Sequence, residues 1–270
     1  MKNNTKNGLL CIIIGMGISI IASVILFFTE GAINIDFFSG LLFLIGIILM
    51  AIGRKEFGEK HQKFVIYAII IFIITFIVTA IIIGILIFAM LSSIDVSDSA
   101  VNVDFSPIKN IFLIAPIAAV LGGITNILLV HELEDQKGKN ILYIAFIVTL
   151  ITSFYVAFIG MQIADEMIDD LDVIIDEIER DSGYYSTSEV TEKFEDKTVE
   201  FQRDLSKVGA IGLIGETLYL IAFIIPYNRI KSGELAPELP SYQKRCMTCG
   251  RVVPSDSVVC AYCGRRFDNM

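Results

Sequence analysis

Uninterrupted apolar runs constrain this chain more than any other feature of its sequence. The longest begins at Phe64 and reaches Leu91 without a charged residue. About 18 consecutive apolar residues are enough for a helix to cross a bilayer, whereas a soluble helix must keep a polar face for water. Hydrophobic residues also make up 54% of the chain and charged residues only 19%. We therefore predict an all-α polytopic membrane protein.

Six segments have the length and composition expected of membrane-spanning helices, namely residues 8–28, 37–53, 64–91, 111–130, 141–163 and 208–227. The first follows Lys2 and Lys6, as the apolar part of a signal peptide would. It is longer than the about 7–15 apolar residues usual in a signal peptide, and no A-x-A-type cleavage site follows it. We therefore interpret it as a permanent anchor.

The charges of the loops predict the orientation in the cell membrane. Arg54–Lys63 holds four Lys or Arg residues and His131–Asn140 holds two. On the opposite side, Thr29–Asp36 holds none and Ser92–Asn110 only Lys109. Basic loops stay in the cytoplasm, so we expect a multi-pass protein with both termini cytoplasmic. The two basic loops also resemble each other at a constant offset, which leaves an internal repeat of span pairs open.

Residues 164–207 form the one long connection between predicted spans, and their pattern indicates two helices. Apolar residues recur every three or four positions on both sides of Asp181–Ser188, which is rich in turn-forming residues. This spacing resembles the seam of a coiled coil. We predict an antiparallel helical hairpin that continues the fifth and sixth spans outside the cell. The apolar positions are Met167, Leu171, Ile174, Ile178, Val190, Phe194, Phe201 and Leu205.

The predicted hairpin carries most of the acidic charge. Fifteen Asp or Glu and five Lys or Arg give it a net charge of −10, and since the whole chain carries −9, the remainder carries +1. Asp165–Asp172 suggests a surface for cations or for a partner. A solvated face that obeys the orientation rule explains the charge more simply, and no calcium-hand motif is present. Binding of cations by this segment stays open.

Four of the five cysteines lie near the C-terminus as two C-x-x-C pairs, each followed by glycine. They are Cys246, Cys249, Cys260 and Cys263. Two such pairs supply four thiolates, which can close a tetrahedral zinc shell, and each glycine permits the tight turn required. So short a segment buries too little surface to fold alone, so we expect metal binding and folding to be one event.

The same segment is similar to a known family of modules. The residues that carry the similarity are Cys246, Cys249, Gly250, Pro254, Cys260, Cys263 and Gly264. Over residues 244–267 the chain resembles the short zinc-ribbon domains found at the ends of many bacterial and archaeal proteins. The resemblance implies one structural Zn²⁺ and a role in interaction or structure instead of catalysis. It does not extend to the predicted spans.

Other chemistries of the cysteines are less consistent with the sequence. Disulfides need an oxidising compartment, whereas the loop charges place this tail in the cytosol. Iron of the rubredoxin type uses similar turns, usually with a longer interval between them, and it stays an alternative to zinc. Cys11 lies in the first predicted span and is interpreted as an inert buried thiol. We expect a small core from Val252, Val253, Val258, Val259 and Phe267.

The charge of the ribbon bears on its partner. Its basic residues, Lys244, Arg245, Arg251, Arg265 and Arg266, outnumber the acidic ones. A zinc ion with four thiolates carries about −2, which these charges balance, and few aromatic residues are present for base stacking. We therefore expect a cytosolic protein partner first, the membrane lipid surface second and nucleic acid last; a homo-oligomer stays open.

The chain divides into three parts. Residues 1–231 form the membrane domain, 232–243 a linker and 244–270 the ribbon. The linker contains Pro237 and Pro240 and lacks apolar periodicity, so we predict an extended tether.

Glu216 is the acidic residue that lies well inside a predicted span. Ionisable residues in a membrane are costly and are often functional. Asn126 and Thr125 in the fourth span are its expected polar companions. An ion or proton relay is one interpretation, and a protonated carboxyl that joins two helices by a hydrogen bond is the simpler one. Gly209, Gly212 and Gly215 are expected to let a neighbouring helix approach.

Enzyme motifs are missing from the sequence. "HELED" at His131 lacks the second histidine of H-E-x-x-H, and we interpret His131 and His61 as exposed loop residues. No G-x-S-x-G, P-loop or G-x-G-x-x-G motif occurs. We therefore expect no enzyme but a scaffold or sensor whose ribbon recruits a protein. The alternative hypothesis is a small-solute or ion transporter or channel that uses Glu216.

Overall fold

The computed structural model describes residues 3–29, 36–92, 95–97, 100–102, 106–180, 187–237, 243–254 and 256–267, and these are mainly helical. The helices are α1 (Asn4–Thr29), α2 (Asp36–Gly53), α3 (Gly58–Ser92), α4 (Ile114–Val130), α5 (Gln136–Arg180), α6 (Thr187–Gly209) and α7 (Leu213–Ser232). The 3-10 turn η1 (Ser106–Leu113) precedes α4, and η2 (Ala210–Gly212) joins α6 to α7. The predicted helical class is confirmed.

Two short antiparallel pairs of strands complete the described part of the fold. β3 (Gln243–Arg245) and β4 (Val252–Pro254) belong to the C-terminal ribbon. β1 (Asp95–Ser97) pairs with β2 (Ala100–Asn102) in the connection between α3 and η1. The sequence does not reveal the β1–β2 pair, because strands of three residues are too short to show an alternating pattern.

Five helical segments of the described chain are long and apolar enough to cross a membrane. They are Asn4–Ile25, Gly58–Ala89, Lys109–Val130, Gln136–Leu171 and Glu195–Ser232. The predicted span at 37–53 corresponds to a shorter apolar helix, Phe38–Gly53. These helices are compatible with a membrane protein.

The outer surface of α3 has the character of a lipid-facing helix. Phe76 is 71% exposed and Phe88 72% exposed, and isoleucines along the same helix are exposed as well. In water such a surface would be unfavourable, whereas lipid chains solvate it at no cost. The exposed apolar side chains of α3 therefore match the composition that suggested a membrane protein.

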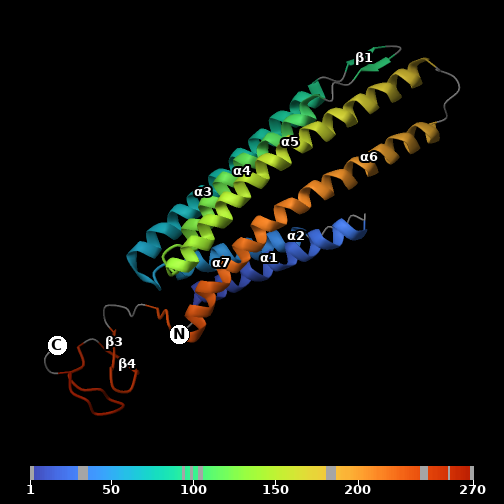
Figure 1. Cartoon of the computed structure of the whole chain (residues 1–270). Helices are drawn as coiled ribbons and strands as arrows, with labels where there is room; N and C mark the ends of the chain where they lie inside the picture. The colour runs from blue at the N-terminus through green and yellow to red at the C-terminus, as the bar shows by residue number, and fades with distance from the viewer. Residues whose placement is uncertain are drawn as a thin grey trace.

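The helices converge at one end of the molecule. Neighbouring helices follow the order α2, α1, α7, α5, α4, α3. In Figure 1 the α1–α2 pair lies near α3, α4 and α5 at the end of the molecule marked N, and the two groups of helices separate towards the opposite end. The buried core lies where they meet and includes Leu9 of α1, Met50 of α2, Leu129 of α4, Leu142 of α5 and Phe223 of α7.

Glycines bring α1 and α2 into backbone contact. A Cβ atom on Gly46 would lie 2.8 Å from the carbonyl oxygen of Gly8, and one on Gly8 would lie 2.7 Å from that of Gly46. At the end of the pair, Thr5 Oγ1 donates to the carbonyl oxygen of Gly53 at 3.1 Å. Small residues on both helices permit this close approach, as in many membrane-helix pairs. Gly122 aligns with Gly46 when the two basic loops are matched at their constant offset. A Cβ atom on Gly122 would meet open space, so the two glycines do not share a packing role.

Glu56, in the turn after α2, caps the start of α1. Its carboxylate accepts hydrogen bonds from the backbone N–H groups of Asn4 at 2.9 Å and Thr5 at 3.0 Å. The first N–H groups of a helix have no partner within the helix, and an anion is favoured beside them. The turn thus holds the start of α1 at the convergent end.

The two helices predicted for the acidic connection are present in the described residues. α5 continues to Arg180, and α6 begins at Thr187 and runs back towards α7 (Figure 1). Lys197 Nζ of α6 lies 2.7 Å from Asp170 Oδ2 of α5. A helix as long as α5 extends about 67 Å, roughly twice the thickness of a hydrocarbon core. Leu171 and Ile174 of the predicted seam are buried.

Two expectations about single residues were wrong. His61 is not exposed: it is fully buried in α3, where its ring packs edge-on against Phe57. Of the three glycines near Glu216, Gly215 alone meets another helix, at Thr149 of α5, whereas Gly209 and Gly212 face open space.

Candidate metal centre and helix-bundle cavity

The ribbon is built from two loops with matching hydrogen bonds. In the first, Gly250 N–H donates to Cys246 O at 2.8 Å, and in the second, Gly264 N–H donates to Cys260 O at 2.9 Å. Both glycines have positive φ angles, 70° and 73°, which only glycine adopts without strain. The strand pair β3–β4 supports the first loop, and a bridge between Val259 and Arg266 supports the second.

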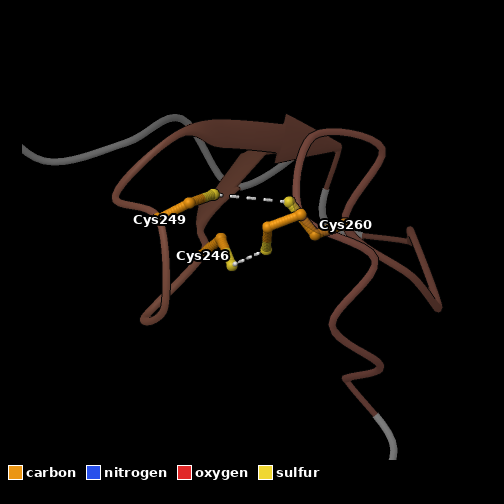
Figure 2. Close-up of side chains that lie close together, drawn as sticks. Cys246, Cys249 and Cys260 are labelled. Atoms are coloured by element: carbon orange, nitrogen blue, oxygen red, sulfur yellow. Dashed lines mark hydrogen bonds between the residues drawn. The ribbon is translucent and has the colours of Figure 1, made fainter.

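These loops turn all four sulfur atoms towards one point. Cys246 Sγ lies 3.6 Å from Cys263 Sγ, and Cys249 Sγ lies 3.6 Å from Cys260 Sγ (Figure 2). All four lie within 4.8 Å of one another. Zinc bound tetrahedrally at about 2.3 Å from each sulfur would separate the sulfurs by about 3.8 Å. The cluster can therefore bind a metal ion, and its geometry fits a closed zinc site that would link the two loops.

The thiols differ in their tendency to ionise. The backbone N–H of Cys249 lowers the pKa of Cys246 to about 6. The N–H of Arg265 lowers the pKa of Cys263, but burial and the three neighbouring sulfurs outweigh it and raise this pKa to about 12. Without a cation, four crowded thiols resist complete ionisation. A divalent metal ion offsets the repulsion between the neighbouring thiolates, because it stabilises all four of them at once.

The core of the ribbon is smaller than expected. Val253 is buried beside the buried Cys246 and Cys260, with Phe267 packed against them. Val258 and Val259, which were predicted to belong to this core, are 61% and 41% exposed. The prediction was wrong because the loops place the cysteines, and not these valines, at the centre.

The structure brings two of the three predicted polar residues of the membrane domain into one cavity. Glu216 of α7 and Asn126 of α4 both line a space of about 280 Å³. Thr125 does not line it, since its buried hydroxyl donates to Leu121 O of its own helix at 2.9 Å. The remaining lining residues are Gly15, Met16, Ser19, Ser39, Gly40, Phe43 and Tyr219.

Several polar residues of this cavity were missed in the sequence. Ser19 Oγ of α1 donates to Glu216 Oε2 at 3.5 Å, although the two residues are far apart in the chain. Ser39 of α2 and Tyr219 of α7 complete the polar lining. Tyr219 lies three residues after Glu216 and hence on the same side of α7, which could have indicated it. Nothing in the sequence indicates the two serines, because their depth and rotation depend on helix packing.

A buried carboxyl group at the convergent end was also missed. Glu134, just before α5, is 6% exposed, and neither of its oxygens has a hydrogen-bond partner among the described residues. Burial raises the pKa of Glu134 to about 8; the Asp135 carboxylate also raises it, while Arg229 and Lys139 lower it. The carboxyl sits against Gly138, where a larger residue would collide with it. Glu134 is therefore mainly protonated at neutral pH.

Comparisons with known proteins found no relative of this chain. No family model matches it, and neither the curated proteins nor the solved structures contain a significant match.

Proposed function

We propose that this protein is a non-enzymatic membrane adaptor whose cytosolic zinc ribbon binds a protein partner. The observation that carries the proposal is the exposed apolar surface of the ribbon around its four-cysteine cluster. Met247 is 76% exposed, Tyr262 57% and Val258 61%. Exposed apolar groups on a module that the metal already holds together are typical of a protein-binding surface.

The basic side chains of the ribbon support a protein partner over nucleic acid. Lys244 Nζ lies 4.1 Å from the ring centre of Phe267, and the Arg251 guanidinium carbon lies 4.6 Å from that of Tyr262. Arg265 donates to Thr248 Oγ1 at 2.6 Å. These cations already stabilise the fold of the ribbon, which leaves fewer of them to contact phosphates.

The cytosolic location rests on the loop charges and on six membrane crossings. The end of the bundle that bears the N-terminus is also the end beside β3 and β4 (Figure 1), which supports an even number of crossings. Gly233, with a φ angle of 82°, ends α7, and Leu235 N–H donates to Arg229 O at 3.0 Å. Leu235 packs against the core, so the linker begins as a fixed helix cap and not as an extended tether. The predicted tether residues 238–242 lie outside the described residues.

Affinity purification of the full-length protein from native membranes tests this function. The test variant replaces Met247 and Tyr262 with serine, and the control variant replaces Val199, an apolar residue of α6 that is 53% exposed. A cytosolic protein that co-purifies with the wild type and the Val199→Ser control should be lost with the double variant. Zinc content should stay at about one ion per chain in all three proteins. Identical sets of partners from all three would contradict the adaptor function.

The cavity around Glu216 supports a second candidate function, the passage of a small solute or ion. An acidic side chain in an apolar helical bundle is often part of a transport path. The flux of small solutes and ions into proteoliposomes, measured for the wild type and for Glu216→Gln, tests this second function. We expect the substitution to abolish flux, and a wild type without flux would remove this candidate.

A further inference from the structure

We propose that Glu134 and Arg229 form a pH-sensitive switch that releases the start of the linker to the ribbon. When the Glu134 carboxyl loses its proton to the solvent, the Arg229 guanidinium leaves Glu234 and pairs with Glu134 instead. The inference goes beyond the proposed function, because it concerns the attachment of the linker to the bundle and holds whatever the ribbon binds. It rests on the cap of α7, the burial of Glu134 and the position of Arg229 between them.

Arg229 holds the first residues of the linker against the end of α7. Its Nε donates to Glu234 Oε1 at 2.8 Å. Its backbone oxygen accepts hydrogen bonds from the N–H of Leu235 at 3.0 Å and from Ser232 Oγ at 3.1 Å. Leu235 in turn packs against the core of the bundle. The contact between Arg229 and Glu234 thus fastens the place where the linker leaves the helices.

The same guanidinium contacts the turn that carries Glu134. Arg229 Nη1 donates to Leu133 O at 2.8 Å, and Leu133 directly precedes Glu134 in the chain. The Arg229 side chain is 21% exposed, so it lies mostly between α7 and this turn. Neither oxygen of Glu134 has a hydrogen-bond partner among the described residues. A cation that is paired elsewhere therefore lies beside a buried carboxyl that has no partner of its own.

Burial makes Glu134 sensitive to pH. The residue is 6% exposed, and burial raises its pKa to about 8. Three charged groups act on it as well: Asp135, just before α5, raises the pKa, whereas Arg229 of α7 and Lys139 of α5 lower it. The carboxyl is therefore neutral in slightly acidic solution and charged in alkaline solution.

The histidines near this turn have other partners. The ring of His131 lies 3.1 Å from Glu132 Oε1 and 3.0 Å from the Tyr143 hydroxyl. His61 of α3 packs edge-on against Phe57, and the Glu132 carboxylate is the charge that acts on it. The response of Glu134 to pH is thus assigned to the carboxyl itself and to the charges of α5 and α7.

Loss of the proton changes which carboxylate Arg229 favours. A buried charge without a partner is strongly destabilising, whereas an ion pair at the surface contributes little. The Glu234 side chain is 61% exposed, so water hydrates its carboxylate once the guanidinium has left. Glu134 has no such access to water. Lys139 is the competing cation, but it lowers the pKa of Glu134 less than Arg229 does. Ionised Glu134 therefore draws Arg229 away from the linker.

Fluorescence anisotropy of the full-length protein in detergent tests the switch. The chain has no tryptophan, so Ala236→Trp gives the linker a single indole reporter at an exposed position. Between pH 6 and pH 9.5 its residual anisotropy should fall by about a third, as for a segment whose order parameter drops from about 0.85 to below about 0.6. The midpoint should lie near the Glu134 pKa of about 8. Circular dichroism should show the same helix content at both pH values.

Variants of this reporter protein locate the switch. Glu134→Gln keeps the shape of the neutral carboxyl, so it should fold and hold a high anisotropy at both pH values. Glu234→Ala removes the acceptor of Arg229 and should lower the anisotropy already at pH 6. Lys139→Gln is the control, since it removes the competing cation of the same site, and it should respond to pH as the parent does.

Four results would overturn the proposal. The first is an unchanged anisotropy in the parent, and the second is the same decrease in Glu134→Gln. The third is a high anisotropy of Glu234→Ala at pH 6, which would show that the ion pair does not hold the linker. The fourth is loss of the response in Lys139→Gln, which would assign ionised Glu134 to Lys139. None of these measurements involves a co-purified protein, so the switch and the adaptor function can fail separately.

Discussion

The ribbon and the helical bundle assemble their polar sites in opposite ways. All four sulfurs of the ribbon come from one short segment, and two equivalent loops bring them within 4.8 Å of one another. The cavity of the bundle draws on residues as distant in sequence as Ser19 of α1 and Glu216 of α7. The four-cysteine cluster is thus encoded locally, while the cavity exists only if the helices pack in one particular arrangement.

This difference has an energetic side. The ribbon has little buried apolar surface, since Val253 is nearly its whole buried aliphatic core, so we expect it to need a bound metal ion to fold. The bundle has a continuous core that joins α1, α2, α3, α4, α5 and α7 at one end. We therefore expect the stability of the ribbon to depend on one ion and that of the bundle to depend on many small contacts.

Removal of the metal should produce the largest effect. Cys260→Ser, or a chelator, should unfold the ribbon completely, because three ligands cannot close the tetrahedral shell. Hydrogen exchange of the full-length protein should then show unprotected amides over residues 243–267 and unchanged protection in the helices. Cys11→Ser in α1 serves as the control and should change neither part. Persisting protection of the metal-free ribbon would show that it folds without an ion.

The next largest effect concerns the buried Glu134 of the bundle. Its pKa of about 8 lies above the ordinary value of 4.5, so the folded state binds the proton more tightly than the unfolded state does. The stabilisation is complete below pH 4.5 and is lost as the pH rises towards 8, by on the order of 5 kcal/mol. Thermal unfolding in detergent from pH 5 to 8 should show this decline, and Glu134→Gln should flatten it.

The control for this measurement is Glu59→Gln, an exposed carboxyl at the start of α3. It should reproduce the decline of the wild type. A decline of the same slope in Glu134→Gln would mean that another group causes it.

A smaller effect is expected from the contact between α1 and α2. Gly46→Leu should destabilise the bundle by about 2 kcal/mol, because the new side chain meets the backbone of Gly8 and the side chain of Ile12. Gly84→Leu on α3 is the matched control, since nothing lies within 4 Å of its Cβ position. Thermal midpoints of the two variants compare them directly, and equal midpoints would contradict this close packing.

The smallest effect is expected at the acidic hairpin. Lys197 pairs with Asp170 across α5 and α6, but the two side chains are 37% and 49% exposed, so solvent screens the pair. Lys197→Met should therefore shift the thermal midpoint by no more than about 1 °C, and less in high salt. A shift of several degrees would show that the two arms depend on this ion pair.

The parts of the fold that could be predicted are those that short stretches encode. Apolar runs indicated the long helices, and the C-x-x-C-G pairs indicated Cys246, Cys249, Cys260 and Cys263 as one site. The predictions failed for the burial of single side chains, which the tertiary contacts decide. His61 follows a charged loop in the sequence, yet α3 buries it, and Val258 has the side chain of a core residue but faces solvent.

The sequence by itself predicted the helical class, the apolar helices long enough to cross a membrane, and the four cysteines that lie together as a possible metal site. The physical reason is that helix hydrogen bonds, bilayer thickness and a tight metal-binding turn each involve residues close together in the chain. Only the tertiary structure decided that Asn126 joins Glu216 while Thr125 does not, and that Ser19, Ser39 and Tyr219 belong with them. The rotation of each helix about its axis decides which side chains face the cavity. In uniformly apolar helices this rotation follows from packing between glycines and bulky side chains of neighbouring helices. The order of residues along one helix does not reveal that packing.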